Sequence, residues 1–257
     1  MKNIIGDVDV SMDGHVAIVE IQRPPNNFFD HTLICDLADA FDQLDDETNC
    51  RSIVLAAEGK HFCAGANFAA RAEGTTENDP GALYREAVRM FSNKKPVVGA
   101  IQGAAIGGGL GLSLVPDFRV VCAETRFAAN FVKLGFHPGF GLTHTLPRLI
   151  GQQNANLMFF TGRRVGGEEA LKWGMADILT TLGSIRDAAL ALAHEIAENA
   201  PLGVMATRAT VRQGLAQAVD KATDHELIEQ DRLRQTEDHK EGVRAVAERR
   251  VGNFFGR

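Results

Sequence analysis

Four short apolar runs, two of them followed at once by glycine-rich turns, constrain this fold more than any other feature. The runs cover residues 15–21, 52–56, 96–101 and 118–121. Apolar segments of this length, bounded by glycine or proline, are typical of buried strands. The second and third runs lead into the turns 59–66 (GKHFCAGA) and 103–111 (GAAIGGGLG). The first half of the chain is therefore predicted to be built from strands and tight turns.

Helical spacing dominates the second half. It covers residues 143–150, 154–160, 168–173 and 185–199, a helix with Pro201 at its first position, and an amphipathic tail over 220–250. One earlier helix is expected after Asp30, a predicted N-cap, because apolar residues follow it from Leu33 to Leu44 at helical intervals. The polar segment 73–80 is interpreted as a surface loop, with a lid over a site as the alternative.

Composition excludes several classes of protein. The chain of 257 residues has 27 Lys+Arg, 33 Asp+Glu and a net charge of −6. Without a basic block this argues against nucleic-acid binding. A hydrophobic share of 45% argues against disorder. We find no secretory signal and no apolar run of the ~20 residues that a membrane span needs. Cys35, Cys50, Cys63 and Cys122 lack metal-binding spacing, so we expect inert thiols and the cytosol or an equivalent matrix.

The glycine run 107–109 invites a comparison with phosphate-binding loops. It does not match the dinucleotide fingerprint, because Leu112 stands where the third glycine belongs, and no Gly-Lys-Ser/Thr follows it. The run can instead expose a backbone N–H at the start of a helix over 110–115, where an oxyanion could be stabilised. The alternative is a tight packing corner between a strand and a helix.

Several segments, in order along almost the entire chain, carry a recognisable set of motifs. They are 62–67 (FCAGAN), 95–103 (KPVVGAIQG) continuing to Asp117, 134–141 (LGFHPGFG), 161–170 (TGRRVGGEEA) and 237–244 (EDHKEGVR). Together they resemble the motifs of the crotonase superfamily, the enoyl-CoA hydratase/isomerase family. The resemblance implies an α/β fold, a spiral of ββα units with a C-terminal helical region. It divides the chain into a core with the acyl-CoA site (1–200) and a helical oligomerisation region (201–257).

The resemblance also implies a ligand and an assembly. The substrate is a coenzyme A thioester, with no permanently bound cofactor and no metal, and the assembly is a homotrimer or homohexamer. By motif position, the N–H groups of Ala66 and Gly108 bind the thioester oxygen as it gains enolate character. Contacts with coenzyme A are expected at Arg23, Lys60 and Ala64. No nucleic acid or membrane partner is expected.

The sequence departs from the hydratases at two positions. The resemblance places their two glutamates at Gly111 and Phe131, and neither residue can transfer a proton. The aspartate of the related 4-chlorobenzoyl-CoA dehalogenases and ring-epoxide isomerases maps onto Gly139, which cannot replace it either. A standard two-glutamate hydratase and a single-glutamate isomerase are therefore not expected.

Two histidines remain as candidate acids or bases in the same region. His137 and His144 could each transfer a proton at neutral pH, or could have packing and hydrogen-bonding roles. We favour His137, because its loop faces the site in the relatives. The leading hypothesis is an acyl-CoA lyase or isomerase with an atypical acid/base group. The alternative is a catalytically weak acyl-CoA-binding or assembly subunit.

Other residues have less specific interpretations. Asp117 is interpreted as a structural carboxylate that binds backbone donors. The arginines at 244, 249, 250 and 257 either reach a phosphate site in a neighbouring subunit or form a charged helix face. Phe131, Phe136 and Phe140 either line an acyl pocket or belong to the core.

Overall fold

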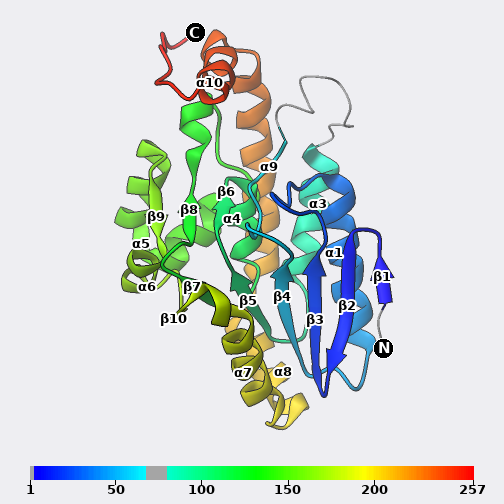
Figure 1. The fold of residues 1–257 in the computed structure, drawn as a ribbon. Helices are drawn as coiled ribbons and strands as arrows, with labels where there is room; N and C mark the ends of the chain where they lie inside the picture. Colours follow the sequence, from blue (N-terminus) through cyan, green and yellow to red (C-terminus); the bar gives the residue numbers. More distant parts are fainter. Residues whose placement is uncertain (1–2, 68–79) are drawn as a thin grey trace.

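A seven-stranded sheet forms the centre of the protein, seen in a computed structural model that describes residues 3–67 and 80–257 (Figure 1). Its strands, in spatial order, are β1 (Asn3–Ile5), β2 (Val8–Asp13), β3 (Val16–Ile21), β4 (Ser52–Ala57), β5 (Val97–Ile101), β7 (Phe118–Cys122) and β10 (Ile178–Thr180). The pairs among β1, β2 and β3 are antiparallel, and every later pair is parallel. The four strands expected from the sequence are confirmed.

Helices cover both faces of this sheet. α1 (His31–Asp46) and α3 (Pro80–Phe91) lie on one face, and α7 (Ile185–Ala197) crosses the other (Figure 1). Alternate strand residues divide between the two faces: Val54 and Val98 pack with α7, whereas Ile53 and Leu55 join the larger core on the other side. This alternation follows from the two-residue repeat of a strand. The unbroken burial of β4 reflects a strand covered on both faces.

A smaller sheet extends from the carboxyl ends of the central strands. It consists of β6 (Ala104–Ile106), β8 (Arg126–Ala128) and β9 (Arg164–Gly166). Between β6 and β7 lies the short helix α4 (Gly108–Ser113), all of whose residues are buried. The 3₁₀ segments are η1 (Asn130–Leu134) and η2 (Leu182–Ser184), and α6 covers Gly167–Trp173.

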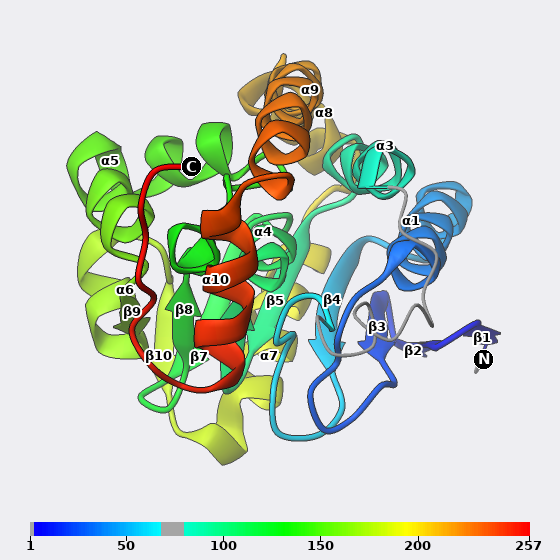
Figure 2. The ribbon, with the colours of Figure 1, turned by 90° about the horizontal axis from the view of Figure 1, so that it is seen from above.

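The remaining helices pack around these two sheets. They are α5 (Leu142–Thr161), α8 (Pro201–Val211), α9 (Leu215–Arg234) and α10 (Glu237–Ala247). Seen from above, α9 lies between α5 and α3, with which it is in contact (Figure 2). α10 packs against η1. The structure thus has the expected mixed α/β core and C-terminal helical region.

Local predictions from the sequence are confirmed in several places. The Asp30 carboxylate caps α1 by accepting the N–H of Leu33 at 2.9 Å, and Pro201 stands at the first position of α8. The four cysteines are free, and burial raises the pKa of the Cys63 thiol to about 12, in accord with an inert thiol.

Within the described chain, no helix combines the length and apolar character that a membrane span requires. The predicted loop 73–80 lies outside the described residues except for Pro80, the first residue of α3.

Candidate active site

Two chain segments, one after β4 and one after β5, lie side by side at the carboxyl edge of the central sheet. The Cys63 N–H donates to the Ala104 carbonyl at 2.9 Å, and the Ile106 N–H donates to the Cys63 carbonyl at 3.1 Å. This short parallel bridge aligns the turn around Ala66 with the glycine run that begins α4. The motif residues that are distant in sequence are therefore neighbours because parallel strands end at one edge of a sheet.

The backbone N–H groups of Ala66 and Gly108 have no acceptor anywhere in the described part of the chain. Ala66 is paired with Phe29 in a parallel bridge that uses the Gly65 carbonyl and leaves the Ala66 N–H free. Gly108 is the first residue of α4, where a helical N–H has no partner within the helix. Such donors can bind an anionic oxygen.

The glycines of this run are also required by packing. An added Cβ would lie 2.2 Å from the Phe29 ring at Gly108 and 2.2 Å from the Cys63 carbonyl oxygen at Gly109. At Gly111 it would lie 2.6 Å from the Cβ of Phe140. The packing-corner interpretation therefore describes the same residues that expose the donor at Gly108. Both properties follow from the absence of a side chain.

Aromatic rings surround this corner. Phe140 is 1% exposed and contacts Phe29 edge-on, with ring centroids 6.1 Å apart, and Phe131 is 8% exposed. Both belong to the main hydrophobic core. Phe136 instead stacks on the ring of His239 at 4.9 Å and lies beneath the guanidinium of Arg234.

His137 has a defined hydrogen-bonding state. Its Nδ1 lies 2.8 Å from the Pro138 carbonyl oxygen, which can only accept, so the neutral ring carries its proton on Nδ1. The basic atom of the neutral ring is then Nε2. The ring of His225, on α9, meets that of His137 edge-on, with centroids 6.2 Å apart. His137 is half-buried on the loop that brings Phe140 against α4.

His144 lies in the first turn of α5, half-buried. Burial, followed by the nearby charge of Arg148, lowers the pKa of the His144 imidazole below its ordinary value. Both effects favour the neutral ring.

Two polar side chains beside Gly139 were not found from the sequence. The hydroxyl oxygen of Tyr84 lies 1.9 Å from the position that a Cβ at residue 139 would take, and the Gln230 amide nitrogen lies 2.4 Å from it. The Tyr84 hydroxyl donates to the Gln230 amide oxygen at 2.9 Å. Glycine at 139 is therefore what leaves room for this pair. One feature of the sequence could have drawn attention to Tyr84, which is the chain's single tyrosine.

The residues expected at coenzyme A lie near the same edge. The Arg23 guanidinium is paired with Asp7 at 2.6 Å and Asp30 at 2.8 Å. Lys60 is exposed in the turn after β4. The Ala64 N–H donates to the Asn26 carbonyl at 2.9 Å, so it is used within the fold.

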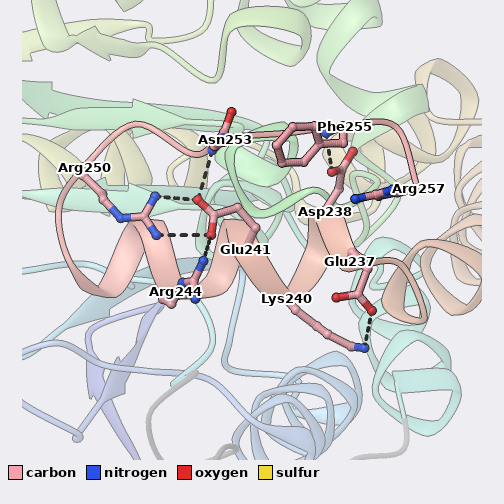
Figure 3. Close-up of a pocket in the computed structure, with 9 residues that line it drawn as sticks. All are labelled: Glu237, Asp238, Lys240, Glu241, Arg244, Arg250, Asn253, Phe255 and Arg257. Atoms are coloured by element: carbon pink, nitrogen blue, oxygen red, sulfur yellow. Dashed lines mark hydrogen bonds and ion pairs between the residues drawn. The ribbon is translucent and has the colours of Figure 1, made fainter.

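A separate cavity of about 730 Å³ lies between α10 and the C-terminal tail (Figure 3). None of the predicted catalytic or coenzyme A residues lines it. Glu241 points between Arg244 and Arg250 and pairs with both, and the Asp238 carboxylate accepts the N–H of Phe255 at 2.7 Å (Figure 3). Arg244 lies on α10 and Arg250 follows the end of that helix, and a phosphate site in a neighbouring subunit stays the other prediction for these arginines. In the described residues, no group of three or more His, Cys, Asp or Glu side chains could hold a metal ion.

Comparisons with known proteins place this geometry in context. Residues 11–257 match the family model described as enoyl-CoA hydratase/isomerase. The chain is 32% identical over 254 residues to (E)-benzylidenesuccinyl-CoA hydratase of Thauera aromatica, covering 97% of this chain and 99% of that protein. It is 32% identical over 251 residues to carnitinyl-CoA dehydratase of Proteus mirabilis, covering 95% and 96%. A solved structure of an enoyl-CoA hydratase/isomerase from Pseudoalteromonas atlantica superimposes with a TM-score of 0.88 at 26% identity, covering 97% of this chain and 100% of that one.

Proposed function

The chain belongs to the enoyl-CoA hydratase/isomerase family, whose members act on acyl-CoA thioesters, and we propose that it adds or removes water next to a thioester carbonyl. The observation that carries this proposal is the pair of free N–H groups at Ala66 and Gly108. Donors aimed at a thioester oxygen stabilise the enolate that forms when the α-proton leaves. The relatives' names, a hydratase and a dehydratase, support water as the group transferred.

His137 is the proposed acid/base group. In the dehydration direction its Nε2 takes the α-proton, and the electrons of the C–H bond move into the thioester as an enolate. Collapse of the enolate forms the α,β double bond and expels the β-hydroxyl, which takes the proton back from Nε2 and leaves as water. A single imidazole therefore both takes and returns the proton, and no glutamate is needed. This agrees with the residues at the two positions that the family motifs assign to the hydratase glutamates, which here are Gly111 and Phe131.

The acyl group is proposed to be bulky. The names of both relatives specify substituted acyl chains, and this supports the proposal. A thioester series from crotonyl-CoA to carnitinyl-CoA and benzylidenesuccinyl-CoA, followed by loss or gain of the conjugated double bond, tests this. Crotonyl-CoA hydration at the rate of an ordinary hydratase would overturn the assignment of the missing glutamates.

Paired substitutions at Gly108 test the oxyanion donor. Gly108→Pro removes the N–H, but its added carbons also meet the Phe29 ring. Gly108→Ala makes the same steric contact and keeps the N–H, so it is the matched control. We expect the proline variant to lose about 10²–10³ in kcat beyond the loss in the alanine variant. Equal losses in both variants would remove Gly108 from the proposed site.

An acyl-CoA-binding or assembly subunit remains the second proposal. It is favoured by the packing of Gly111 against Phe140, which leaves no space for an acid at that position. Saturable binding of acyl-CoA without turnover across the thioester series, with His137→Ala binding as tightly as the wild type, would establish it in place of the enzyme.

The proposed assembly is a homotrimer or homohexamer in the cytoplasm, built through the helical region 201–257. Several apolar side chains there are exposed, among them Leu202 at 77%, Val211 at 65% and Phe255 at 65%. Light scattering is expected to give the mass of three or six chains. A monomer at micromolar concentration would contradict this assembly.

A further inference from the structure

Two buried polar side chains on α9, Glu226 and Gln230, face the loop that carries His137. They are 0% and 2% exposed, and their spacing of four residues places them on one face of the helix. Both reach the segment between residues 137 and 143, called here the His137 loop. Burying a polar side chain costs free energy unless it forms hydrogen bonds, so the hydrogen-bond partners of these two residues indicate which part of the chain they hold in place.

Glu226 holds the C-terminal end of the His137 loop. Its carboxylate accepts the N–H of Gly141 at 2.8 Å, and the N–H and hydroxyl of Thr143 at 2.9 and 2.6 Å. Gly141 is the N-cap residue of α5 and has no side chain to cap that helix. Glu226, 85 residues later, therefore supplies the acceptor that a local Ser or Asp usually provides.

Gln230 holds the N-terminal end of the loop. Its amide nitrogen donates to the His137 carbonyl at 3.1 Å, and its amide oxygen accepts the Tyr84 hydroxyl at 2.9 Å. Because one end of the amide only donates and the other only accepts, these two partners fix its orientation. The His137 backbone is thereby tied to α9 and, through Tyr84, to α3.

We propose that Glu226 and Gln230 are positioning residues that hold the His137 loop in its reactive geometry. This inference rests on the proposed function of His137, which touches the substrate, whereas these two residues act through it. A role in packing alone would be filled by apolar side chains of similar volume, without the cost of burying an amide and a carboxyl group. Small displacements of a reacting group are enough to slow catalysis greatly.

Substitutions at Gln230 separate positioning from packing. Gln230→Met keeps the volume and removes both hydrogen bonds, and we expect kcat to fall about 10- to 100-fold while KM changes less than about threefold. Gln230→Glu keeps the acceptor for Tyr84, but its carboxylate repels the His137 carbonyl. Once protonated, it can donate to that carbonyl, so its kcat relative to the wild type is expected to recover as the pH falls. Gln217→Met, at an exposed position of the same helix, is the control.

A second readout does not depend on turnover. In protein labelled at histidine, the ring signals of His137 report its environment, and Gln230→Met is expected to shift or broaden them while Gln217→Met leaves them unchanged. If the wild type processes no thioester, the proposed function fails, and these signals still decide whether Gln230 holds the loop. Unchanged His137 signals in Gln230→Met, or a Gln230→Glu variant whose relative kcat does not vary with pH, would overturn the positioning role.

Discussion

Gly111 shows how closely single residues are packed around the candidate site. A methyl group there would lie 2.6 Å from the Cβ of Phe140, a side chain that is 1% exposed and in edge contact with Phe29. We expect Gly111→Ala to lower the free energy of unfolding by about 1–3 kcal/mol, because the ring has little room to move. Urea denaturation measures this change.

The matched control is Gly203→Ala, in the exposed helix α8. Its nearest neighbour is 4.0 Å from the added carbon, and alanine is the better helix former. A gain of about 0.5–1 kcal/mol is expected there. A Gly111→Ala protein as stable as the wild type would mean that the corner can open, and that an acid could be accommodated at position 111.

Residues differ in how far their surroundings can be predicted from sequence. The N-cap at Asp30 can be predicted from sequence because the capping carboxylate and the N–H that it accepts, that of Leu33, lie three residues apart. Tyr84 and Gln230 are 146 residues apart, and no local pattern indicates their contact. The resemblance to the family motifs predicted that the turns of Ala66 and Gly108 lie together. It did not predict the contacts of Glu226 or Gln230, because both residues lie outside those motifs.

At the scale of elements, Asp117 joins α8 to the central sheet. The sequence predicted a structural role for this carboxylate. One oxygen accepts the N–H of Val97 at 2.8 Å and the Nε of Arg208 at 2.8 Å, and the other accepts from Arg212 at 2.8 Å. Arg208 is 7% exposed and also donates to Asn93. Removing the Arg208 guanidinium leaves the half-buried Asp117 carboxylate with Arg212 as its remaining ion-pair partner and leaves two Asn93 oxygens without this donor.

Arg208→Met is therefore expected to cost about 3–5 kcal/mol of unfolding free energy. Amide hydrogen exchange in α8 should rise with it, because the helix loses the ion pair and hydrogen bonds that Arg208 makes with Asp117 and Asn93. Arg232→Met is the control: this side chain is 64% exposed and pairs with Glu229 within one helix, where solvent screens the contact, so little change in stability is expected. Similar losses in both variants would show that the Asp117 cluster does not anchor α8.

Element boundaries were the part of the fold that periodicity placed least well. Segments 143–150 and 154–160 were expected as separate helices, and the structure has them as α5, interrupted at Gly151 by a φ of 77°. The tail 220–250 was expected as one amphipathic stretch, and it is two helices. Thr236 ends the first by capping the second, accepting the His239 N–H at 3.1 Å. Apolar spacing continues across such a cap, so spacing alone could not locate it.

At the scale of the whole molecule, Glu226 couples stability to pH. Burial raises the pKa of its carboxyl group to about 7 from an ordinary 4.5, against the opposing hydrogen bonds from Thr143 and Gly141. The folded chain therefore holds this proton more tightly than the unfolded chain does. The contribution to stability is fully present below about pH 4.5 and is lost as the pH rises through about 7.

The change in unfolding free energy across this window is expected to be about 3–4 kcal/mol, because the pKa rises from 4.5 to about 7 and each pKa unit corresponds to about 1.4 kcal/mol. Glu226→Gln cannot titrate, so its stability should decline less than that of the wild type between pH 4.5 and 7. It will be less stable throughout, because its amide N–H faces a backbone donor on the His137 loop.

Glu241→Gln is the control of opposite sign: the hydrogen bond from Arg250 lowers the pKa of Glu241, so its charge stabilises the fold only above acid pH. Urea unfolding of the three proteins at intervals of pH measures these slopes. If stability changes with pH in the same way for the wild type and Glu226→Gln over this range, Glu226 is ionised in the folded chain at pH 5. The His137 loop is then held by a carboxylate and not by a protonated carboxyl group.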